Sequence, residues 1–70
     1  GLQDMEQQKI DTIKVIVDTY NEKLTFKFDY KEFDYLLERS ITEISEVVKF
    51  NVTTRLEKQE AELKRIKKEQ

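Results

Sequence analysis

The chain has 70 residues, of which 37% are hydrophobic and 40% charged, and its net charge is −2. A chain of this length forms one small domain with a marginal core, because it buries only about 60% of the surface that it exposes when unfolded. It contains neither cysteine nor histidine, which excludes disulfides and thiolate or imidazole metal sites. A partner chain is therefore the expected additional source of stability, and no cofactor is expected.

The order of residues argues against a membrane protein. The longest uninterrupted apolar run is three residues, so no segment is expected to span a bilayer. No signal-peptide pattern opens the sequence, and cysteine is absent, which together favour a cytoplasmic location.

Residues 1–9 are mostly polar and are expected to fray. The next twenty residues alternate between apolar and polar side chains in two runs, 12–18 and 23–30, separated by a turn at 19–22. Alternation of this kind is typical of strands, because successive side chains point to opposite faces. The apolar faces of the two predicted strands are Ile13, Val15 and Val17, and Leu24, Phe26, Phe28 and Tyr30.

A helix through residues 4–24 is the alternative. It is supported by apolar residues that recur in steps of three and four, namely Ile10, Ile13, Val17, Tyr20 and Leu24. β-Branched residues crowd this region and favour strands, so we prefer the hairpin.

A helix is expected to follow Asp29, because Asp29 and Glu32 have the spacing of a capping box. The same pattern recurs at Ser40 with Glu43 and at Thr54 with Glu57, and each marks a candidate helix start. Residues 51–54 combine poor helix formers with a shift in the apolar stripe, so a hinge, stutter or short loop is expected there.

The fold class predicted from these elements is α+β, a β-hairpin followed by a long C-terminal helix, in a dimer. The alternative is an all-α helical hairpin or coiled coil. The predicted organisation is a frayed 1–9, a hairpin-plus-helix core at 10–50 and a helical oligomerisation segment at 51–70. The expected core residues are Phe26, Phe28, Phe33, Leu36, Leu37, Ile41 and Ile44.

The helix is predicted to extend beyond the reach of the hairpin, which leaves an apolar stripe uncovered. A second copy of the chain is the simplest cover for such a stripe. The predicted oligomer interface consists of Val48, Val52, Leu56, Leu63 and Ile66.

Catalysis is not expected. The carboxylates lie among lysines on what should be a solvated helix face, and Ser40 and Ser45 have no histidine to activate them. The single glycine leaves no phosphate-binding loop. The sequence therefore predicts a non-catalytic protein-interaction module that forms a homodimer through its C-terminal helices.

Two alternatives remain. A strand followed by two helices over residues 23–50 resembles the ribbon-helix-helix DNA-binding dimers, although the glycine-bearing turn usual in that family is missing. The candidate nucleic-acid contacts are Lys64, Arg65, Lys67 and Lys68, but the acidic total argues against a broad phosphate-binding surface. The second alternative is a small protein inhibitor that masks an enzyme with its acidic surface.

Overall fold

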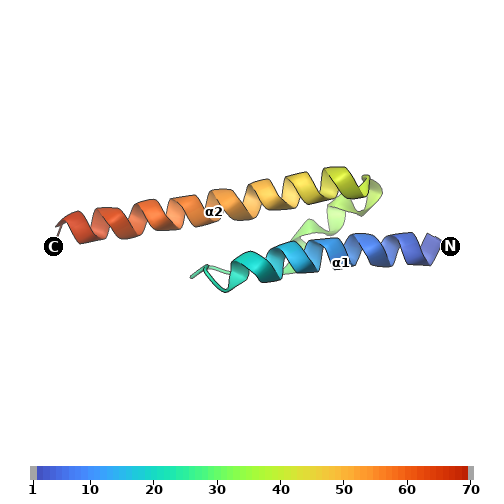
Figure 1. The fold of residues 1–70 in the computed structure, drawn as a ribbon, viewed down its shortest axis with the longest axis horizontal. Helices are drawn as coiled ribbons and strands as arrows, with labels where there is room; N and C mark the ends of the chain where they lie inside the picture. The colour runs from blue at the N-terminus through green and yellow to red at the C-terminus, as the bar shows by residue number, and fades with distance from the viewer. Residues whose placement is uncertain (1, 70) are drawn as a thin grey trace.

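A computed structural model describes residues 2–69 of the chain, with side chains described for residues 4–66. Three helical elements follow one another: α1 (Leu2–Asn21), the 3₁₀ helix η1 (Tyr30–Glu38) and α2 (Ile41–Glu69). The molecule is elongated, with principal extents of 56 × 17 × 15 Å, and α1 and α2 lie along its long axis (Figure 1). Neither α1 nor α2 is long and apolar enough to cross a membrane.

The two long helices run in the same direction. Near the start of α1, the Lys9 ammonium donates a hydrogen bond of 3.1 Å to the carbonyl oxygen of Leu37, just before α2 begins. Just past the end of α1, the carbonyl of Lys23 accepts a hydrogen bond from Gln59, deep within α2. The segment between the helices must therefore lead the chain back to the start of α1, as the green part of Figure 1 shows.

No strand occurs among residues 2–69, so the predicted β-hairpin and the α+β class are wrong, and the all-helical alternative is the better description. The first predicted strand lies within α1. Val17 is 2% exposed and Ile13 is equally buried, whereas Val15 is 64% exposed, as a helical period requires. The burial of this stripe against α2 outweighs the preference of β-branched residues for strands.

The second predicted strand is an irregular segment between α1 and η1. Lys23 N and Leu24 N donate to the carbonyls of Tyr20 and Asn21 at 3.0 and 3.1 Å, which ends α1 with a tight turn. Beyond this turn only Leu24 is buried, and Phe26, expected in the core, is 79% exposed. The segment has no neighbouring strand to pair with, so its alternating pattern does not produce a sheet.

The predicted capping box at Asp29 is confirmed. Asp29 Oδ1 accepts from Lys31 N at 3.0 Å, and Glu32 Oε2 accepts from Asp29 N at 2.8 Å. The helix that begins here is η1, which ends at Glu38, where Arg39 N donates to the Leu36 carbonyl at 2.8 Å.

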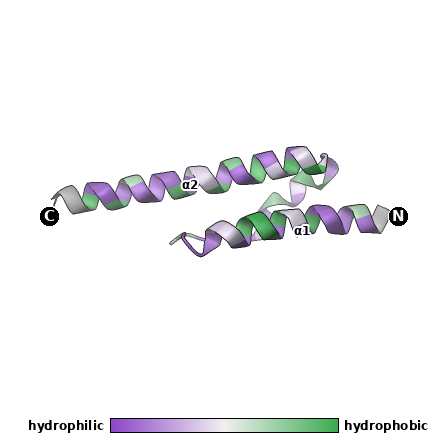
Figure 2. Cartoon of the chain, in the orientation of Figure 1, coloured by the Kyte–Doolittle hydropathy of each residue, from purple (hydrophilic) through white to green (hydrophobic). Residues whose placement is uncertain are grey.

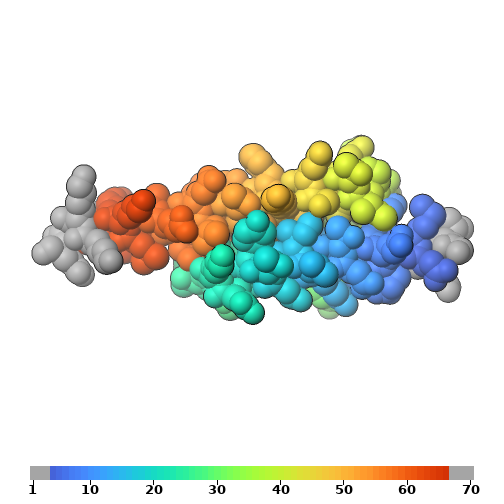
Figure 3. All heavy atoms as spheres, in the orientation of Figure 1, coloured from blue at the N-terminus to red at the C-terminus, as the bar shows by residue number. Residues whose placement is uncertain are grey.

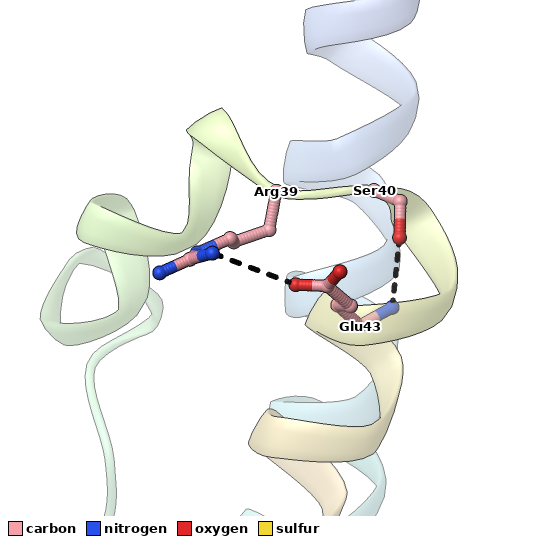
Figure 4. Close-up of polar contacts among 3 residues, drawn as sticks. All are labelled: Arg39, Ser40 and Glu43. Carbon is pink, nitrogen blue, oxygen red and sulfur yellow. Dashed lines mark hydrogen bonds and ion pairs between the residues drawn. The ribbon is translucent and has the colours of Figure 1, made fainter.

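The long helix begins eleven residues later than predicted, at the second capping pattern. Glu43 N donates to Ser40 Oγ at 3.2 Å, which satisfies one of the free N–H groups at the start of α2 (Figure 4). The Arg39 guanidinium lies 4.0 Å from the Glu43 carboxylate across the same turn. Ser40 therefore marks the start of α2.

The break predicted at residues 51–54 is wrong, because α2 continues through them. Asn51 Nδ2 donates to the Val47 carbonyl and Thr54 Oγ1 to the Phe50 carbonyl, each at 2.7 Å. These side chains bond to the helix four residues back instead of capping a new one. Val52, at the centre of the expected break, is fully buried, and its packing holds the helix continuous.

The core lies between α1, η1 and α2. Figure 2 shows hydrophobic residues concentrated in the middle of α1 and thinly spaced among hydrophilic ones along α2. Of the core residues predicted from the sequence, Phe33, Leu36 and Ile44 are confirmed, Phe28 and Leu37 are half-buried, and Phe26 and Ile41 are exposed. The buried hydrophobic residues are Ile13, Val17, Leu24, Phe33, Leu36, Ile44, Val48 and Val52.

The same substitution at two nearby positions tests the helical assignment of residues 12–18. Val17→Ala should lower the free energy of unfolding by roughly 2 kcal/mol, because it leaves a cavity in the core. Val15→Ala should change it by less than about 0.5 kcal/mol, because that side chain faces solvent. Urea unfolding followed by circular dichroism measures both. Equal losses at the two positions would contradict the helix, since a strand places both side chains on its buried face.

Candidate functional site

The polar side chains of the described residues all lie at least partly on the surface. Among them, no group of three or more histidine, cysteine, aspartate or glutamate side chains is arranged to hold a metal ion. No polar or charged residue in the described part of the chain is buried, so carboxylates such as Asp34 and Glu38 face solvent. The candidate site described below lies on the surface.

An open groove of about 690 Å³ lies where α1 stops and α2 continues. In Figure 3 the teal and green atoms of this turn end abruptly, while the orange and red atoms of α2 project beyond them. The walls are mainly apolar, with Phe26 on one side and Leu63, which is 56% exposed, on the other. The lining residues are Thr25, Phe26, Arg55, Lys58, Gln59, Glu62 and Leu63.

One wall of the groove is held in place by the side-chain amide of Gln59. Its Oε1 accepts from Thr25 N and its Nε2 donates to the Lys23 carbonyl, each at 2.6 Å. A neighbouring strand would satisfy backbone groups in the same way. Gln59 therefore replaces a strand partner for this segment and ties it to α2.

Arg55 holds the next part of the segment. Its guanidinium carbon lies 3.4 Å from the centroid of the Phe28 ring, and its Nη1 donates to the Phe26 carbonyl at 3.1 Å. The Phe28 ring in turn packs against Phe33 with 5.3 Å between centroids. The amide of Asn21 exchanges two hydrogen bonds with the Phe28 backbone, at 2.8 and 2.9 Å. The backbone on both sides of Phe26 is fixed, and its side chain is left in solvent.

The predicted interface residues separate into two groups. Val48 and Val52 are 0% exposed and belong to the core that α1 and η1 complete within the same chain. Leu56 is half-buried, and Leu63 and Ile66 are exposed on the part of α2 that extends beyond α1. The uncovered apolar surface is therefore shorter than the sequence predicted and is displaced towards the C-terminal end of α2.

Phe26 was missed as a site residue, because the predicted strand placed it in the core. No sequence signal reveals it, because the exposure of its side chain depends on which segments lie beside it in the three-dimensional fold.

Two of the four predicted nucleic-acid contacts lie in the part of the chain whose side chains are described. Lys64 and Arg65 are exposed on α2, and Arg65 Nη2 lies 3.3 Å from the Glu62 carboxylate. The side chains of Lys67 and Lys68 lie outside the part of the chain whose side chains are described. The strand that would enter a DNA groove in a ribbon-helix-helix protein is absent from residues 2–69.

A second, shallower hollow of about 330 Å³ lies on α2 alone, around Phe50. Phe50 is 71% exposed, more than Leu63, yet it belongs to a face of α2 that no second segment borders. It provides a matched control for substitutions in the groove.

Comparison of the chain with protein-family models, with curated proteins and with solved structures finds no match.

The role of Gln59 is testable by its removal. Gln59→Ala should release the backbone of Lys23 and Thr25, and it should cost about 1–2 kcal/mol because two hydrogen bonds of modest net value are lost. The amide of Thr25 should exchange with deuterium markedly faster, as measured by NMR. Gln8→Ala, on the exposed surface of α1, should leave that exchange rate unchanged. Unaltered protection of Thr25 in Gln59→Ala would show that other contacts hold the segment.

Proposed function

We propose that the chain is a non-catalytic protein-interaction module that homodimerises through the C-terminal part of α2. The observation that carries this proposal is the apolar groove lined by Leu63, with exposed Ile66 beyond it, on a helix that continues where its intramolecular cover ends. An amphipathic helix laid into an apolar groove is a common mode of protein recognition.

The energetics favour a weak dimer. Burial of Phe26, Leu63 and Ile66 on both copies stabilises the complex by about 1–2 kcal/mol per side chain, since each is already partly covered. Association costs about 4–15 kcal/mol in lost translational and rotational freedom. The two terms are of similar size, so the net free energy of association is small. Dimers should therefore be observed only at high protein concentration.

A second candidate is the binding of a helix from a different protein, of which a small protein inhibitor is one form. It is favoured by the closed core, because Val48 and Val52 are buried without any second copy. A monomer of this kind presents the same groove to a foreign helix. A molar mass that stays near 8.5 kDa at every concentration would favour this candidate over the homodimer.

DNA binding is not proposed, because the predicted reading strand is absent from the described chain. The cytoplasmic location expected from the sequence stays a prediction.

The homodimer is tested by sedimentation equilibrium up to about 1 mM protein, because a weak dimer forms only at high concentration. The average molar mass should rise from 8.5 kDa towards twice that value as concentration increases. Leu63→Glu should abolish the rise, because it places a charge in the apolar contact. Phe50→Glu should leave the rise intact, since Phe50 lies outside the groove. Identical behaviour of the two variants would refute the groove as the interface.

A further inference from the structure

We infer that the two copies pair antiparallel, with the two-fold axis close to Leu63, so that the end of one α2 occupies the groove of the other. This arrangement rests on the proposed homodimer and names its geometry. Three features of the described chain point to it: the place where α1 ends, the charges on either side of Leu63 and the position of Phe26.

The first feature is that α1 already covers the apolar face of α2 along its first half. Ile44, Val48 and Val52 are fully buried beneath α1 and η1. The contacts of Gln59 with residues 23 and 25 show that this cover stops near the level of Gln59. Leu63 and Ile66 follow at helical spacing along the same side of α2 and are exposed. The open part of the face therefore begins where α1 stops.

A parallel dimer conflicts with this cover. If both α2 helices ran side by side in the same direction, the α1 helices of both copies would lie between them over residues 44–56. Each helix with its side chains is about 10 Å across, so the two α2 helices would be forced apart. In the antiparallel arrangement α2 of the second copy continues the line of the first copy's α1. The α1 helix of the second copy lies at the opposite end of the dimer. Each α2 is then covered along its whole length.

The second feature is the separation of charge about Leu63. Residues 57–62 contain three glutamates and one lysine, whereas residues 64–69 contain four basic residues and one glutamate. Antiparallel pairing about Leu63 sets the acidic block of each copy opposite the basic block of the other. Parallel pairing sets acidic against acidic and basic against basic. Exposed charge pairs contribute only about 0.2–1 kcal/mol each, but their sum is enough to select an orientation.

The third feature is the exposed ring of Phe26. With the axis at Leu63, Ile66 of the second copy lies level with position 60, between Gln59 and Leu63, which line the groove together with Phe26. The backbone of the Phe26 segment is held by Arg55 and Gln59, so the ring is already positioned for this contact. Little ordering is then required on binding, which offsets part of the cost of association.

The orientation is tested by a distance between spin labels at Thr42→Cys. Thr42 is exposed in the first turn of α2, and the chain has no cysteine of its own, so only this site is labelled. Because Thr42 lies 21 residues before Leu63, an antiparallel dimer separates the two labels by about 60 Å at about 1.5 Å per residue. A parallel dimer, with both α1 helices between the α2 helices, brings them within about 40 Å, the sum of three helix spacings and the label arms.

Double electron–electron resonance at about 1 mM labelled protein distinguishes the outcomes, because a high concentration favours a weak dimer. A distance near the long value, lost in the Leu63→Glu background, supports the antiparallel dimer. A short distance overturns the orientation while leaving the homodimer standing. If neither a label distance nor a rise in molar mass is seen, the proposed homodimer itself is wrong, and the orientation with it.

Charge reversal gives an independent test. Glu60→Lys with Glu62→Lys makes both blocks basic. The double variant should weaken dimerisation about tenfold, because several weak charge pairs are lost. Addition of Lys64→Glu and Arg65→Glu to the same chain exchanges the two blocks and should restore the original affinity. It also preserves an opposite-charge pair at positions 62 and 65, so helicity measured by circular dichroism should not fall. Failure of the fourfold variant to recover would overturn the antiparallel register.

Discussion

The requirement that shapes this molecule is that α1 and α2 run in the same direction. The 20 residues of α1 cover about 30 Å, so the 19 residues between the two helices must lead the chain back over a similar distance. A 3₁₀ helix rises about 2.0 Å per residue, more than an α-helix, and η1 with the irregular segment before it spans the distance easily. The returning segment also contributes Phe33 and Leu36 to the core.

A returning segment without a sheet has backbone groups that need other partners. Side chains of the two long helices supply them: Asn21 from α1, Arg55 and Gln59 from α2, and Lys9 for the Leu37 carbonyl. The candidate groove results from these hydrogen bonds. The side chains that hold the returning segment against α2 also fix Phe26 at the rim, so the connection and the interaction surface depend on the same residues.

Local features of the sequence predicted local structure well and long-range packing poorly. The capping patterns at Asp29 and Ser40 both begin helices, because a cap depends on residues only three positions apart. Residues 12–18 satisfy both a strand and a helical period, and only the packing of Ile13 and Val17 against α2 decides between them. The burial of Val48 and Val52 within one chain was not predicted for the same reason, because the segment that covers them, α1, was expected to be a strand. The open end of the stripe at Leu63 and Ile66 was visible in the sequence, whereas Phe26 was not.

The shared direction of α1 and α2 also bears on how the chain folds as it is synthesised. The turn that ends α1 is held by Arg55 and Gln59, which are separated from it by 29 to 36 residues. The C-terminal end of α1 therefore lacks these contacts until most of α2 has emerged from the ribosome. Contacts so distant in sequence slow folding, since a long loop must close before any of them is gained. We expect the nascent N-terminal half to remain open to chaperones for longer than an antiparallel helical hairpin of equal length would.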